Sequence, residues 1–178
     1  MFKKFYPYEY EESVFSIDYE KLYEKGFRGL IFDIDNTLVP HGADSTPEVD
    51  ELFRYIQGIG FKTLLLSNND EARTLRFLKN IDSLYICDAD KPKPAGFLKA
   101  VEKLDMPRDK VIVIGDQVFT DIYGANRSGL ASILVKFIGH DTETKTGKRR
   151  RLEKFVLSMY SRSKACVNRL GGIHKKEV

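Results

Sequence analysis

Two carboxylates follow a short apolar run in the stretch Gly29-Leu30-Ile31-Phe32-Asp33-Ile34-Asp35-Asn36-Thr37-Leu38. The run 30–32 is typical of a buried strand, and turn-forming residues bound it on both sides. Ligands of open α/β sheets bind beyond the carboxyl ends of the strands, which is where this prediction places Asp33 and Asp35. Because two carboxylates one residue apart repel each other, we expect either a bound cation or a division of roles between nucleophile and acid/base.

Apolar runs alternate with helix-like segments along the chain of 178 residues. Strands are predicted at 30–32, 63–66, 83–86, 111–114 and 131–135, and helices at 47–58, 70–80, 95–104 and 119–128. Residues 1–28 are expected to form a lead-in with a short helix near 19–25. Strands that alternate with helices form a parallel sheet with right-handed crossovers. The predicted fold class is therefore α/β, a Rossmann-like parallel sheet flanked by helices, with one sizeable core.

The carboxyl-terminal part of the chain differs in charge from the rest. Residues 136–178 hold twelve Lys/Arg and four Asp/Glu, a net charge of +8 in a chain whose total is +3. We predict a core over 1–138 and a basic tail over 139–178, in which apolar residues from Leu152 to Leu170 follow helical spacing. A basic amphipathic helix favours an anionic partner: a membrane surface, nucleic acid or the ribosome. The alternative is a terminal helix that is solvated or packs on its own core or a second subunit.

Composition argues against several classes of protein. No window approaches the ~20 consecutive apolar residues of a membrane span, and no apolar signal core follows the basic N-terminus. The two cysteines, Cys87 and Cys166, lie far apart without metal-ligand spacing, which indicates reduced thiols. We therefore expect a cytoplasmic protein, either free or peripheral on the inner face of the membrane.

Polar clusters follow four of the predicted strands. They are Asp33-Ile34-Asp35-Asn36-Thr37, Ser67-Asn68-Asn69, Asp90-Lys91-Pro92-Lys93-Pro94, and Gly115-Asp116-Gln117-Val118-Phe119-Thr120-Asp121. Each cluster alone has a structural explanation as a helix cap or tight turn. Because the carboxyl ends of parallel strands share one edge of the sheet, we expect these clusters to converge on one crevice.

The predicted crevice holds four carboxylates, a serine hydroxyl and a lysine. Clustered carboxylates without histidine or cysteine favour a hard cation with oxygen ligands, Mg²⁺ before Zn²⁺. The lysine and the hydroxyl would hold phosphoryl oxygens that the cation does not. The predicted chemistry is phosphoryl transfer, in which one aspartate attacks and another donates and accepts the proton.

At these residues the chain resembles the haloacid dehalogenase (HAD) superfamily of phosphatases. The matching motifs are Asp33-x-Asp35-x-Thr37, Ser67, Lys91-Pro92-x-Pro94-x-x-Phe97 and Gly115-Asp116-x-x-x-Thr120-Asp121. The resemblance implies that Asp33 is the nucleophile and Asp35 the general acid/base. It also implies that Mg²⁺ is held by Asp33, the main-chain carbonyl of Asp35 and Asp116, with Asp121 as a further ligand or a supporting residue.

The same resemblance implies which residues bind the substrate phosphate. They are Ser67, Asn68 and Lys91. Lys93 is the alternative to Lys91 because it also precedes a proline, although the spacing to Phe97 favours Lys91.

Similarity to the YqeG-type branch of the superfamily covers more of the chain. It rests on Phe5-x-Pro7, Ser13-Val14-Phe15-x-Ile17, Gly26-Phe27-Arg28-Gly29 and Gly124-Ala125-Asn126-Arg127. That branch is similar to the phosphatidylglycerophosphate phosphatases of mitochondria and plastids. The motifs lie too close together in sequence for a cap domain of ~50 residues between them, so an open site is expected.

The leading hypothesis is a Mg²⁺-dependent phosphomonoesterase that forms an aspartyl-phosphate and acts on phosphatidylglycerophosphate, an anionic phospholipid. One alternative is a phosphatase for a soluble or nucleic-acid phosphate. Another is a membrane-, ribosome- or RNA-binding module with a vestigial site. Whether the chain forms an oligomer is left open.

Overall fold

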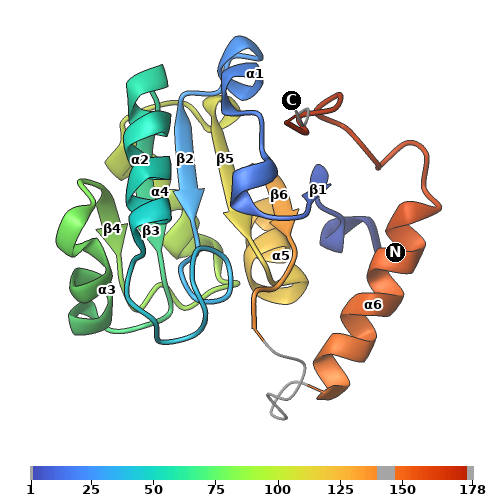
Figure 1. Ribbon diagram of the computed structural model, residues 1–178. Helices are drawn as coiled ribbons and strands as arrows, with labels where there is room; N and C mark the ends of the chain where they lie inside the picture. The colour runs from blue at the N-terminus through green and yellow to red at the C-terminus, as the bar shows by residue number, and fades with distance from the viewer. Residues whose placement is uncertain (1, 140–146, 176–178) are drawn as a thin grey trace.

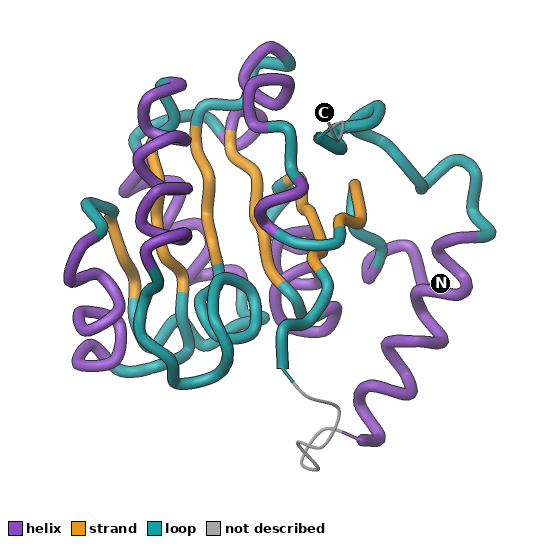
Figure 2. Tube along the Cα trace, viewed as in Figure 1, coloured by secondary structure: helices purple, strands orange, loops and turns teal. Residues whose placement is uncertain are grey.

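Six parallel strands form the centre of the computed structural model, with helices on both faces of the sheet (Figures 1 and 2). The structure describes residues 2–139 and 147–175. The strands are β1 (Glu9–Glu11), β2 (Gly29–Phe32), β3 (Lys62–Leu66), β4 (Leu84–Ile86), β5 (Val111–Gly115) and β6 (Ala131–Val135). Their order across the sheet is β1-β6-β5-β2-β3-β4, and every neighbouring pair is parallel. All six strands therefore end at the same edge.

The described residues form six α-helices. They are α1 (Tyr19–Glu24), α2 (Pro47–Ile59), α3 (Glu71–Phe77), α4 (Pro94–Leu104), α5 (Tyr123–Arg127) and α6 (Gly147–Ser161). The ends of α2 follow from its sequence. Thr46 caps the first turn by accepting from Val49 N, and Gly60 stops the helix with φ of 114°.

The central strand β2 is buried on both of its faces. Leu30 and Phe32 pack in a cluster with α1 and α2, whereas Ile31 packs in a second cluster with α4 and α5. A strand covered on both faces has a continuous apolar sequence, as the run 30–32 does. This burial fixes the position of the strand end from which Asp33 and Asp35 emerge.

The five predicted strands and the predicted parallel α/β fold are confirmed, with small shifts at the ends. The segment predicted as one helix at 119–128 is instead a π-helical turn, Val118–Ile122, followed by α5. The segment predicted at 70–80 is α3 followed by a 3-10 turn, Leu78–Asn80. Between β2 and β4 the chain forms only α2, β3, α3 and this turn, so no cap domain lies between these strands.

The carboxyl-terminal helix is shorter than the predicted apolar stripe. Helix α6 ends at Ser161, and residues 162–172 form turns, so the prediction of one helix through Leu170 is wrong. The chain leaves the helix at Arg162, and the positive φ of Asn168 is incompatible with a continuous helix as far as Leu170. Leu170 instead lies in the main core cluster with α1 and α2.

One side of α6 packs on the rest of the protein. Val156 and Tyr160 are buried in a cluster with Tyr6, and the Tyr6 and Tyr160 rings meet edge to face. Leu152 and Phe155 remain about half exposed, at 50% and 51%. The amphipathic character of this helix and the division of the chain at residue 139 stay predictions.

Among the described residues, no helix combines the length and the apolar character needed to cross a membrane.

Candidate active site

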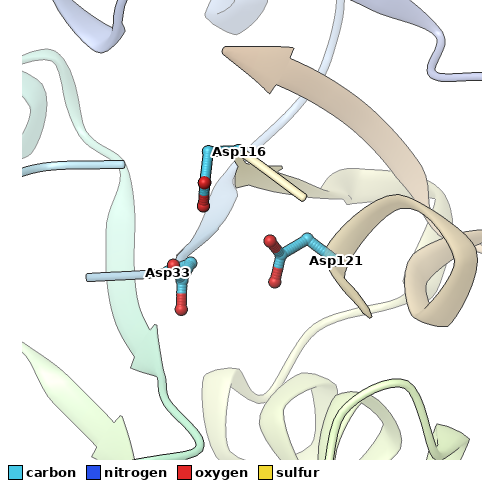
Figure 3. A group of neighbouring side chains, drawn as sticks. All are labelled: Asp33, Asp116 and Asp121. Atoms are coloured by element: carbon cyan, nitrogen blue, oxygen red, sulfur yellow. The ribbon is translucent and has the colours of Figure 1, made fainter. Parts of the chain in front are cut away.

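Three aspartates converge at the carboxyl edge of the sheet (Figure 3). Asp33 follows β2, Asp116 follows the neighbouring strand β5, and Asp121 belongs to the π-helical turn after β5. Each offers a carboxylate oxygen, and these oxygens lie within 4.8 Å of one another. All three residues are buried. The parallel topology thus produces the convergence that the strand-end clusters predicted.

A glycine allows Asp121 to approach the two strand ends. A Cβ atom at Gly115 would lie 2.5 Å from Asp121 Cγ, which is closer than van der Waals contact allows. The backbone then turns so that Gln117 N donates to Asp121 Oδ2 over 3.1 Å. The Gly-Asp pair at this strand end is therefore required by packing as well as by chemistry.

Lys91 reaches the aspartate cluster, and Lys93 does not. The Nζ atom of Lys91 lies 2.5 Å from Asp33 Oδ1 and 2.7 Å from Asp121 Oδ1, and its side chain is only 4% exposed. The side chain of Lys93 is 69% exposed and pairs with Asp90 at the surface. Of the two lysines left open by the sequence, Lys91 is the one that the structure places at the site.

Burial dominates the electrostatics of the cluster. It raises the pKa of Asp33 to about 6, although Lys91 opposes the shift. Burial, with the charges of Asp33 and Asp121, also raises the pKa of Asp116. Burial alone would lower the pKa of Lys91, but Asp121 and Asp33 outweigh it and raise that pKa, so Lys91 stays protonated. With every group ionised, three carboxylates face one ammonium.

The remaining charge of the cluster suits a divalent cation. All the candidate ligand atoms are carboxylate oxygens, which Mg²⁺ prefers over nitrogen or sulfur. Opposite ligands of an octahedral Mg²⁺ lie about 4 Å apart, because each bond is about 2.1 Å long. The oxygens of Asp33, Asp116 and Asp121 lie within 4.8 Å of one another, so small movements of these side chains would allow them to share one cation.

Thr37 joins two of the aspartates. Its hydroxyl Oγ1 lies 3.2 Å from Asp33 Oδ2 and 3.1 Å from Asp116 Oδ1, so one proton is shared between two acceptors. This threonine is buried. Its contact fixes the orientation of both carboxylates without adding charge.

The side chain of Asp35 lies outside the aspartate cluster. Its Oδ2 accepts a hydrogen bond from Asn69 Nδ2 over 2.6 Å, and its Oδ1 accepts from Arg73 Nη2 over 2.9 Å and from Gly42 N over 3.1 Å. Burial alone would raise the pKa of Asp35, but these donors together lower it. Asp35 is therefore an ionised carboxylate held by α3 and the loop after β2. Metal binding through its main-chain carbonyl stays a prediction.

Ser67 and Asn68 occupy the end of the next strand, β3. The buried Ser67 accepts a hydrogen bond from Asn69 N over 3.0 Å. The side chain of Asn68 contacts the backbone of Lys91, because Lys91 N donates to its Oδ1 over 2.8 Å and its Nδ2 donates to Lys91 O over 3.3 Å. Asn68 therefore fixes the loop that carries Lys91, a contact that the sequence does not predict. Phosphate binding by Ser67, Asn68 and Lys91 stays a prediction.

Comparison with known proteins assigns the family. A model of the haloacid dehalogenase-like hydrolases matches residues 42–129. Over 164 residues the chain is 36% identical to the Bacillus subtilis (strain 168) protein called "Probable phosphatase YqeG", covering 91% of this chain and 95% of that protein. The chain belongs to the haloacid dehalogenase-like hydrolases, and it is an enzyme of the phosphatase class.

Two further relatives extend the comparison. The chain is 30% identical over 158 residues to the Arabidopsis thaliana "Phosphatidylglycerophosphate phosphatase 1, chloroplastic/mitochondrial", covering 82% of this chain and 45% of that protein. It therefore spans about half the length of this plant relative. A crystal structure of a protein from Listeria monocytogenes serotype 4b superposes with a TM-score of 0.54 at 20% identity, covering 66% of this chain and 84% of the other. That structure shares the fold.

Proposed function

We propose that this phosphatase hydrolyses a phosphomonoester through an aspartyl-phosphate on Asp33, requires Mg²⁺, and acts on phosphatidylglycerophosphate. One observation carries the proposal: the buried group of Asp33, Asp116 and Asp121 with Lys91 at its centre. The negative charge of these carboxylates favours a divalent cation, and a phosphoryl group brings the negative oxygens that the cation and the lysine would bind.

Each residue has a distinct role in the proposed reaction. Mg²⁺, when bound by Asp33, the carbonyl of Asp35 and Asp116, supplies positive charge that offsets the charge of the phosphoryl oxygens. Asp33 attacks phosphorus through the carboxylate oxygen that does not bind Mg²⁺, and the ester oxygen leaves. Lys91 and Ser67 hold the phosphoryl oxygens in line with that attack. Asp121 keeps Lys91 in place.

Asp35 is the general acid and general base of the proposed reaction. After taking up a proton from water, it donates that proton to the leaving oxygen, and in the second half of the reaction it takes a proton from the water that attacks the phosphoryl group. This role requires the carboxyl group to leave at least one of its present donors, Asn69, Arg73 or Gly42 N, and turn toward Asp33.

Two features support a lipid as the substrate. A relative at 30% identity carries the name of a phosphatidylglycerophosphate phosphatase. In addition, Leu152 and Phe155 are half exposed on α6, where Arg151 and Lys154 are also exposed. Apolar and basic side chains together favour contact with an anionic bilayer. We place the enzyme in the cytoplasm, at the inner face of the membrane.

The test is phosphate release from phosphatidylglycerophosphate in Mg²⁺, beside glycerol phosphate and with or without anionic liposomes. We expect release that requires Mg²⁺, is faster from the lipid, and disappears in Asp33→Asn. Asp109→Asn is the control, because Asp109 is exposed in the turn before β5, at the edge of the sheet opposite the site. Equal activity on soluble phosphates without liposome dependence would contradict the lipid substrate. Full activity of Asp33→Asn would contradict the mechanism.

A further inference from the structure

The guanidinium group of Arg73 is buried with part of its hydrogen-bonding capacity unused. Its Nη2 donates to Asp35 Oδ1 over 2.9 Å and to Ala43 O over 2.7 Å. Its Nε and Nη1 are inaccessible to solvent and have no hydrogen-bond partner within the described residues. The side chain is only 11% exposed. Buried polar groups are normally paired, so these N–H groups need an explanation.

Arg73 lies beside the proposed acid/base, on the side where the leaving group departs. Because Asp35 protonates the leaving oxygen, side chains in contact with Asp35 line the path of the leaving alcohol. A second arginine from α3, Arg76, holds the same loop, since its Nη2 donates to Gly42 O over 2.8 Å and its Nε pairs with Asp44 over 2.7 Å. The leaving-group side thus carries two arginines within one turn of helix.

The present contacts of Asp35 hold its carboxyl group turned away from the cluster. Both of its oxygens accept hydrogen bonds, and the donor to Oδ1 includes the cation Arg73. While these contacts are made, the carboxyl group does not face the phosphorus atom that Asp33 would attack, so it cannot serve the leaving oxygen. An anion that accepts hydrogen bonds from Arg73 in place of Asp35 would allow the Asp35 carboxyl group to turn toward Asp33.

We propose that Arg73 binds a second phosphate group, carried by the leaving alcohol, and thereby selects phosphomonoesters whose leaving group is itself anionic. A guanidinium group matches the oxygens of a phosphate with paired donors, and it is the side chain suited to such recognition. The inference rests on the proposed phosphatase reaction. In phosphatidylglycerophosphate the second phosphate is the phosphodiester, a glycerol unit away from the scissile phosphate. A free bisphosphate presents the same chemistry.

A matched pair of soluble substrates isolates this role. Propane-1,3-diol bisphosphate and 3-hydroxypropyl phosphate differ only in the second phosphate. We expect wild-type enzyme to prefer the bisphosphate in kcat/KM, and Arg73→Gln to lower the ratio of the two kcat/KM values by about tenfold or more, the loss of a hydrogen bond between charged groups. The loss is expected mainly as a higher KM for the bisphosphate, and Arg73→Lys should restore part of the ratio.

Arg54→Gln is the matched control. Arg54 is an exposed arginine on α2 that pairs with Glu51 one turn away on the same helix, so its replacement should leave the ratio unchanged. Short-chain phosphatidylglycerophosphate is the third substrate. If Arg73→Gln also lowers the kcat/KM for this lipid relative to the kcat/KM for 3-hydroxypropyl phosphate, the lipid phosphodiester is a source of the second anion. A selective effect on the bisphosphate alone supports the site with a free phosphate as its ligand.

A binding measurement separates this inference from the proposed reaction. Calorimetry in Mg²⁺ compares bisphosphate binding to Asp33→Asn with and without Arg73→Gln, and it needs no turnover. We expect the second substitution to weaken binding of the bisphosphate by about tenfold while 3-hydroxypropyl phosphate is affected less. Equal losses for the two ligands, or equal losses of kcat/KM, would overturn the inference and leave Arg73 as a residue that only positions Asp35. Absence of phosphate release from every substrate, with selective binding intact, would overturn the reaction alone.

Discussion

Replacing Lys91 by methionine tests the charge balance of the aspartate cluster without any assumption about substrate. The substitution keeps the apolar part of the side chain but removes the ammonium that lies 2.5 Å from Asp33 and 2.7 Å from Asp121. Three carboxylates then share a buried site with no cation. Loss of one partner from a buried ion pair costs about 3–5 kcal/mol, and proton uptake by the carboxylates reduces this cost.

We expect Lys91→Met to lower the free energy of unfolding by about 3 kcal/mol in the absence of metal, because its cost should fall at the lower end of that range. For a chain of this length, a loss of this size lowers Tm by about 6–12 °C. Millimolar Mg²⁺ should recover part of the loss, because a cation in the cluster offsets the same charge. Urea unfolding and thermal melting, each with EDTA and with Mg²⁺, measure both effects.

Lys93→Met provides the control for this prediction. Its ammonium pairs with Asp90 at the surface, where an ion pair contributes about 0–1 kcal/mol. The reasoning would be refuted if the Lys91 and Lys93 variants lost the same stability, or if Mg²⁺ did not stabilise Lys91→Met.

Three further predictions concern the same cluster. Thr37→Val keeps the shape of the buried side chain but removes the hydroxyl between Asp33 and Asp116, so Mg²⁺ affinity measured by titration should fall about 10–100-fold; unchanged affinity would contradict this. In metal-free protein, the pKa of Asp33 is raised to about 6, so protonated Asp33 favours the folded state. This contribution to stability is fully present below the pKa of Asp33 in the unfolded chain and is lost as pH rises through about 6. The free energy of unfolding, measured in urea, should therefore differ less between pH 4.5 and pH 7.5 in Asp33→Asn than in the parent protein. Gly115→Ala places a Cβ atom 2.5 Å from Asp121 Cγ, so this variant should unfold about 1–3 kcal/mol more easily and bind Mg²⁺ more weakly, and normal metal affinity would argue against Asp121 being held by this contact.

The sequence predicts the convergence of the site because parallel strands end together. Asp33 and Asp116 follow apolar runs, and the Ser67-Asn68-Asn69 and Lys91-Pro92 patterns mark the other two strand exits. None of this requires knowledge of how side chains pack. It requires only that the runs are strands of one parallel sheet, which their alternation with helices indicates.

The contacts of Asp35 could not be predicted in the same way. They join the loop after β2 to Asn69 and to Arg73 on α3, two segments that are brought together only by folding. Arg73 lies in the first turn of α3 with no motif around it, and an isolated arginine on a helix is expected at the surface. Its burial was not visible before the structure.

The edge strand β1 was missed for a related reason. It contains Glu9 and Glu11, and charged residues in a short segment do not indicate a buried strand. Both carboxylates are buried because the end of the chain covers them: Leu170 N donates to Glu9, and His174 contacts Glu11 over 2.7 Å. Burial raises the pKa of Glu9. Only the return of the distant tail residues makes this strand possible.

The central claim is that Asp33 carries the phosphoryl group, and trapping that group is its most direct test. The enzyme is mixed with phosphatidylglycerophosphate and Mg²⁺, stopped in acid and treated with borohydride, which reduces an aspartyl-phosphate to homoserine. Peptide mass spectrometry then locates the reduced residue. We expect homoserine at position 33 and at no other aspartate. Rapid phosphate release with position 33 unmodified, or with the modification at Asp35, Asp116 or Asp121, would contradict it.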